Sequence, residues 1–166
     1  MDSSAAAAPT GEVLCVNTFN VDASPGKLVA LLSPTSVEQV RAGWLTLVPS
    51  FEEGCDVVQL PESAGFRATN KHGSWMWVTD IACVQGQAPT VFSCRVYVSE
   101  PEEPAGARPS KHMFTVVQTW TLALREGGAT VERKFTDFVG SEGTREFLLG
   151  GMIAKENENV VTALAE

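Results

Sequence analysis

Three polar side chains fall on strand positions that otherwise hold apolar residues, and they are the best candidates for chemistry. Alternate residues of the strands predicted between His112 and Val139 put Gln118, Arg133 and Asp137 on the apolar, inward side. A buried arginine without a partner is costly, so Arg133 should pair with Asp137, with another acid, or with an acidic or carbonyl group of a ligand. Because Arg133 and Asp137 together could polarise a carbonyl group and move a proton, they are the candidate catalytic residues.

Two alternatives stay open for Arg133. Its α-carbon and that of Asp137 would lie about 13 Å apart on one strand, so a direct pair needs a bulge or an unusual rotamer. If the register slips by one residue after the predicted turn at Glu126–Gly128, Arg133 faces solvent instead.

The tyrosine and the two histidines are poorly placed for catalysis on the inward face of the predicted sheet. Tyr97 is predicted to face outward, His72 lies in a turn, and His112 begins a strand at the rim. Any catalytic role therefore falls to Arg133 and Asp137.

The cysteines and the known motifs point to no metal and no cofactor. Cys15, Cys55, Cys83 and Cys94 form no Cys-x-x-Cys pair and have no histidines at metal-ligand spacing. A P-loop, a dinucleotide fingerprint and a serine elbow are all missing from the sequence. We therefore expect four reduced thiols in a cytoplasmic protein, with neither a cofactor nor a metal site.

The hydrophobic pattern predicts an α+β fold. A first strand over Glu12–Val21 is followed by two short helices, over Lys27–Leu32 and Ser36–Trp44. From there to residue 139 the period is about two, and turn residues recur about every ten positions, which indicates five or six antiparallel strands. Ser141–Glu166 contains no proline and has helical periodicity, so it predicts one long C-terminal helix, although Gly150 and Gly151 weaken it.

Register sets which residues face inward. In the hairpin of Trp75–Val84 with Thr90–Val98, a turn at Gln87–Ala88 places Ile81 opposite Cys94. Carried through the following strands, this register gives a set of inward-facing residues that helix residues complete. The predicted ligand-binding residues are Trp75, Trp77, Phe92, Phe114, Gln118, Trp120, Arg133, Phe135, Leu149 and Ile153.

Composition and charge restrict the partners. The 166 residues are 44% hydrophobic and 19% charged, as in a folded globular protein. A net charge of -8 disfavours nucleic acid and anionic membranes. No apolar run is long enough for an integral membrane segment. We expect residues 1–11 to be a disordered tail and residues 12–166 to form one domain, with the oligomeric state left open.

Four segments carry a resemblance to a known superfamily: VNTFNVDASPGKLVALLS, GSWMWVTDIACV, GGATVERKFTDF and AKENENVVTALAE. Together with the order of elements, they resemble the START-like, helix-grip (SRPBCC) superfamily, in particular its polyketide cyclase-like and Bet v 1-like branches. The resemblance implies a twisted antiparallel sheet wrapped around a long C-terminal helix, with two short helices after the first strand and a cavity between sheet and helix.

The resemblance also implies a class of function. The expected function is binding of a hydrophobic small molecule, such as a lipid, sterol, polyketide or isoprenoid, in the cavity. One alternative is a cyclase or dehydratase that acts on a polyketide-like substrate in the same cavity. Another is a protein-interaction module that uses the acidic surface and the proline-rich loop at Ser99–Ser110.

Overall fold

A computed structural model describes residues 11–48, 51, 56–60, 65–84, 89–99 and 113–165. Several expectations fall outside these residues: almost all of the predicted tail, Cys55, the turn at Gln87–Ala88, nearly all of the loop at Ser99–Ser110, and His112. Within the described residues, none of the helices has the length and apolar character needed to cross a membrane.

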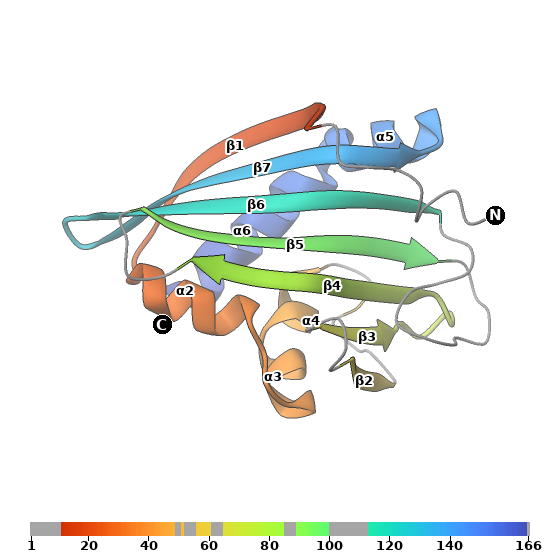
Figure 1. Cartoon of the computed structure of the whole chain (residues 1–166), viewed down its shortest axis with the longest axis horizontal. Coiled ribbons are helices and arrows are strands. Elements are labelled where there is room, and N and C mark those ends of the chain that lie inside the picture. Colours follow the sequence, from red (N-terminus) through yellow and green to blue (C-terminus); the bar gives the residue numbers. More distant parts are fainter. Residues whose placement is uncertain are drawn as a thin grey trace.

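The described residues build a seven-stranded antiparallel sheet with the strand order β1-β7-β6-β5-β4-β3-β2 (Figure 1). Because β1 pairs with β7, the first and last strands of the chain lie side by side. The strands are β1 Val13–Val21, β2 Val57–Leu60, β3 Gly65–Thr69, β4 Trp75–Val84, β5 Thr90–Ser99, β6 Phe114–Arg125 and β7 Gly128–Gly140.

Three short helices follow β1: α2 Pro25–Leu32, α3 Val37–Ala42 and α4 Trp44–Leu47. The Ser24 hydroxyl accepts a hydrogen bond from the Lys27 N–H of α2, and the Ser36 hydroxyl accepts one from the Gln39 N–H of α3, so local caps define both predicted helices. The additional turn, α4, follows Gly43, where a Cβ atom would lie 2.6 Å from the Leu31 carbonyl oxygen. Glycine therefore lets the chain turn close against α2.

The C-terminal helix is continuous in sequence but kinked. It consists of α5 Glu142–Phe147, a π-helical turn η2 Leu148–Met152, and α6 Ile153–Leu164, which crosses one face of the sheet (Figure 1). Gly151 causes the irregularity, since its φ of 142° lies in a region that L-residues rarely adopt.

The two glycines of this turn give a matched pair of substitutions. Gly151→Ala is expected to lower the free energy of unfolding by about 1–3 kcal/mol because of its backbone conformation. Gly150→Ala should be neutral or stabilise by up to about 1 kcal/mol, because it has no positive φ and a Cβ atom there meets nothing within 4 Å. Urea unfolding of both variants measures the difference, and equal values would contradict a backbone requirement at Gly151.

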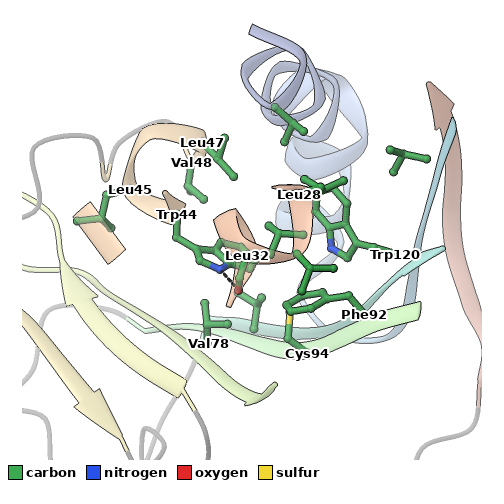
Figure 2. Packing of buried hydrophobic residues seen from close by; sticks show 14 of the residues in the cluster. Leu28, Leu32, Trp44, Leu45, Leu47, Val48, Val78, Phe92, Cys94 and Trp120 are labelled. Atoms are coloured by element: carbon green, nitrogen blue, oxygen red, sulfur yellow. Dashed lines mark hydrogen bonds between the residues drawn. The ribbon is translucent and has the colours of Figure 1, made fainter. Parts of the chain in front are cut away.

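The main core lies between the inner face of the sheet and the helices. Figure 2 shows Phe92 and Cys94 of β5 facing Leu28 and Leu32 of α2, with Trp120 of β6 beside them. Inward positions of β6 and β7 agree with the sequence expectation: Phe114, Val116, Gln118, Trp120, Leu122, Ala129, Val131, Arg133 and Phe135. Leu124 lies at the next inward position of this alternation but is 78% exposed, because the β6–β7 hairpin extends beyond the helices (Figure 1).

A β-bulge in β4 corrects the predicted register of the first hairpin. Near the turn the register is as expected, with Cys83 opposite Phe92. Between Thr79 and Ala82 one extra residue is accommodated, and Asp80 has a φ of 54°. Ile81 therefore does not pair with Cys94, and the expected side for every residue before the bulge is reversed.

The reversal moves Trp75 and Trp77 to the opposite face of the sheet from the main core, so the expectation that they face inward is wrong. They form a separate buried cluster with Leu60 and Tyr97. The Arg67 guanidinium lies 5.4 Å from the Trp75 ring and 5.2 Å from the Trp77 ring. Tyr97 lies on this outer face, as predicted, but it is buried there.

A second bulge, in β7, corrects the position of Asp137. Its φ is 58°, and the pairing of β6 with β7 shifts at this point. The Asp137 N–H donates to the Glu12 carbonyl oxygen, and its Oδ1 accepts from the Gly11 N–H at 3.0 Å. Phe138 takes the inward position and stacks on Phe114. Asp137 thus holds the start of β1 and does not face Arg133, contrary to the sequence expectation.

Candidate ligand-binding cavity

A cavity of about 540 Å³ lies between the inner face of the sheet, α4 and the kinked C-terminal helix. The sheet supplies one apolar wall, made of Met76, Val96, Val98, Phe114, Val116 and Phe135. The opposite wall consists of Trp44, Val48, Phe51, Leu148, Met152 and Ile153. The space is therefore bounded mainly by hydrocarbon and aromatic surface.

The cavity has an exposed end and a buried end. Ser141, Gly143 and Phe147 are exposed and line the open mouth at the start of the C-terminal helix. Gln118 and Glu156 also line the cavity but are almost completely buried, so they mark its deep end. Among the described residues that line it, Glu156 is the one that carries a charge.

Glu156 and Gln118 meet at one buried arginine. Arg133 is 1% exposed, and its Nη2 donates to Glu156 Oε1 at 2.7 Å and to Gln118 Oε1 at 2.8 Å. Its Nε donates to the same Gln118 oxygen at 3.3 Å, and its Nη1 donates to Asn157 Oδ1 at 2.9 Å. The inward orientation of Arg133 is therefore confirmed, and its acidic partner is Glu156.

Aromatic rings complete the surroundings of the guanidinium. Its central carbon lies 4.4 Å from the Trp120 ring and 4.5 Å from the Phe135 ring, within the range of cation–π attraction. Asn157 in turn donates to Asn17 Oδ1 of β1 at 3.3 Å. The buried charge is thus held by β1, β6, β7 and α6 together.

Glu156 was missed in the sequence, although a signal for it exists. It follows Ile153 by three residues and precedes Val160 by four, so it lies on the apolar stripe of α6. An acid on a buried helix stripe needs a cationic partner, and an arginine was already expected on the facing wall. The apolar periodicity of the helix does not by itself reveal this pairing, which depends on how α6 packs on the sheet.

The predicted site residues divide into three groups. Phe114, Gln118, Phe135 and Ile153 line the cavity. Phe92, Trp120 and Arg133 are buried in the layer beside it. The others face elsewhere: Trp75 and Trp77 on the outer face, and Leu149 at the surface.

Leu149 is 47% exposed because the π-helical turn changes the helical spacing ahead of Ile153. Leu148 takes the buried position instead and contributes to the cavity wall. Trp44 and Met76 were also not anticipated as lining residues. Met76 depends on the bulge in β4, and Trp44 depends on how α4 packs against α2.

The described cysteines are free thiols, Cys15, Cys83 and Cys94. Burial raises the pKa of Cys94 to about 12, so this thiol stays protonated and unreactive. In the part of the chain that the structure describes, no group of three or more His, Cys, Asp or Glu side chains could hold a metal ion.

A sheet that wraps around a long C-terminal helix, with short helices after the first strand, is the helix-grip fold, which confirms the fold that the START-like resemblance implies. No protein-family model matches the sequence, and no curated protein matches it. Solved structures do match, with 23 chains found.

Two of the matching structures come from bacteria. The protein XoxI from Bacillus cereus has 12% sequence identity and a TM-score of 0.53, with 92% of this chain and 95% of that chain covered. Protein Ms6760 from Mycobacterium smegmatis has 11% identity and a TM-score of 0.52, with 89% of this chain and 85% of that chain covered. At these identities the likeness shows a common fold alone.

Proposed function

We propose that this chain binds a hydrophobic small molecule, such as a lipid, sterol, polyketide or isoprenoid, in the cavity between sheet and C-terminal helix. The observation that carries the proposal is the apolar cavity of about 540 Å³ with a buried polar pair, Gln118 and Glu156, at its deep end. Ligand sites in proteins are mostly apolar, have volumes of roughly 300–1,000 Å³ and contain a few polar groups that orient the ligand.

The C-terminal helix has an exposed part and a buried part along the cavity, which supports a site that a ligand enters from solvent. Phe147 is 63% exposed at the mouth, where an apolar molecule would enter, whereas Ile153 is buried further along the same helix. The kink at Gly151 separates these two parts of the helix. An apolar ligand would thus contact an exposed aromatic ring first and the enclosed hydrocarbon surface afterwards.

A cyclase or dehydratase would need a proton donor or acceptor in the cavity. Tyr97 and Asp137 both lie away from it. Among the described residues that line the cavity, Glu156 is the remaining acid-base group, and one of its oxygens is bound to Arg133. Binding without chemistry is therefore the function that we favour, and turnover of an extracted ligand would overturn that preference.

Native mass spectrometry of the freshly purified protein, followed by organic extraction, tests the proposal directly. A copurified lipid, sterol, polyketide or isoprenoid would support it and would identify the compound to assay for turnover. An empty protein that also fails to bind neutral apolar dyes would contradict it.

A bulky side chain that fills the cavity should prevent most of the binding of an apolar dye. Val98→Trp places an indole ring in the sheet wall and is expected to weaken the binding of the neutral dye Nile red about tenfold or more. Val84→Trp makes the same change at a strand position that is 52% exposed and outside the cavity, so it should leave the affinity within about twofold. Fluorescence titration measures both, and equal weakening would place the dye elsewhere.

A further inference from the structure

The side-chain amide of Gln118 has a fixed orientation. Its Oε1 accepts hydrogen bonds from Arg133 Nη2 and Nε and from Trp120 Nε1, at 2.8, 3.3 and 3.2 Å. Guanidinium and indole N–H groups can only donate, so the atom that they share must be the amide oxygen. The NH₂ group of Gln118 makes no hydrogen bond to the described residues, and the side chain lines the cavity. The amide therefore offers donors to a ligand.

Glu156 offers the complementary acceptor. Its Oε1 is bound to Arg133, whereas its Oε2 makes no hydrogen bond to the described residues. Glu156 lines the cavity, and it is bound to the same Arg133 nitrogen as Gln118. A donor and an acceptor thus lie close together at the deep end of an apolar space.

The charges at this end disfavour an anionic ligand. Arg133 is fully enclosed and does not line the cavity, and its charge is neutralised by Glu156. A carboxylate head group would therefore meet the Glu156 carboxylate before it reached the guanidinium. Placing like charges together in a water-poor site strongly disfavours binding.

We propose that the ligand carries an uncharged head group that both donates and accepts a hydrogen bond, such as a hydroxyl or a primary amide, and that the cavity excludes carboxylates. This inference rests on the proposed binding function and names its ligand class. A hydroxyl donates to Glu156 Oε2 and accepts from the Gln118 NH₂ group, so both free positions are satisfied at once. A carboxylate has no hydrogen to donate and satisfies the Gln118 position alone.

Competition against Nile red distinguishes these head groups on one chain length. Dodecan-1-ol, dodecanamide and dodecanoate are added to the wild-type protein at pH 8, below their aggregation limits. The alcohol and the amide are expected to displace the dye at concentrations about tenfold lower than dodecanoate. Displacement by dodecanoate at equal or lower concentration would overturn the inference while leaving the binding function intact. Failure of Nile red to bind would instead remove the binding function itself.

A charge variant separates recognition from ordinary partitioning, since any apolar pocket favours an alcohol over an anion. Glu156→Gln keeps an oxygen that accepts from Arg133 and removes the negative charge, so the preference for the alcohol should fall about tenfold. Glu158→Gln makes the same change at an exposed position of α6 and should leave the preference unchanged. If the wild type and both variants prefer dodecan-1-ol over dodecanoate equally, partitioning alone causes the preference.

If Glu156→Gln does not fold, Gln118→Met provides the second test. It keeps the Arg133–Glu156 charge pair and removes the donor that faces the ligand. Affinity for dodecan-1-ol should then fall about tenfold, whereas dodecanoate should remain a poor competitor. An unchanged affinity for the alcohol would contradict a hydrogen bond at this position.

Discussion

Replacing Trp44 with alanine is expected to lower the free energy of unfolding by about 3–5 kcal/mol. The indole ring is 1% exposed and lies at the centre of the contact between α4, α2 and the sheet (Figure 2). Its Nε1 donates to the Leu32 carbonyl oxygen at 2.8 Å, and its ring lies 6.1 Å from that of Phe66. Alanine removes this hydrogen bond and leaves a void that adjoins the cavity. Urea unfolding followed by circular dichroism measures the loss.

Trp44→Phe is the control that separates ring volume from hydrogen bonding. It retains most of the packing against Phe66 but leaves the Leu32 carbonyl oxygen without its donor, which should cost about 1–3 kcal/mol. A loss as large as that of the alanine variant would mean that the hydrogen bond dominates. A loss below about 1 kcal/mol for the alanine variant would contradict the packing role of Trp44.

Most elements of this fold could be predicted from the sequence because their signals are local. Ser24 and Ser36 cap α2 and α3, and Ser141 caps α5, as their side-chain hydrogen bonds show. The change of hydrophobic period between helices and strands separates the two classes of element. The C-terminal helix was also expected, with Gly150 and Gly151 recognised as its weak point.

Register was less predictable, because each bulge depends on the neighbouring strand. In β4, residues 75–78 are apolar on both faces, so the pattern of Trp75, Met76, Trp77 and Val78 agrees equally well with either orientation. The bulge that decides between them is centred near Asp80, and the one in β7 is at Asp137. Aspartate tolerates a positive φ better than most residues. The sequence of one strand, however, does not indicate that its aspartate has a positive φ.

The candidate site was predictable on the sheet side but not on the helix side. Alternation along β6 and β7 identified Gln118 and Arg133 as inward polar residues, and it was correct up to the bulge. The sequence predicts an acidic partner for Arg133 but names only Asp137 among the acids, because distance along the chain is the only distance that a sequence provides. Glu156 is 23 residues away from Arg133 and reaches it only through the packing of α6 on the sheet.

Replacing Glu156 with leucine is expected to lower the free energy of unfolding by about 3–5 kcal/mol, because it leaves Arg133 charged, buried and without an acid. A guanidinium group cannot lose its proton in a protein, so the charge cannot be relieved by neutralisation. Gln118 and Asn157 still accept hydrogen bonds from it, and the Trp120 ring still packs against it, but none of these carries a negative charge. Chemical unfolding measures the loss.

Arg133→Met should cost less than Glu156→Leu, since Glu156 faces the cavity and can be hydrated by a water molecule there. The double variant Arg133→Met with Glu156→Leu should recover most of the stability, because an apolar pair leaves no uncompensated charge. Losses that simply add in the double variant would show that the two side chains do not interact.

Recovery of stability with a lost preference for dodecan-1-ol over dodecanoate would mean that the charge pair serves ligand recognition. Recovery with the preference intact would mean that partitioning into an apolar cavity causes it.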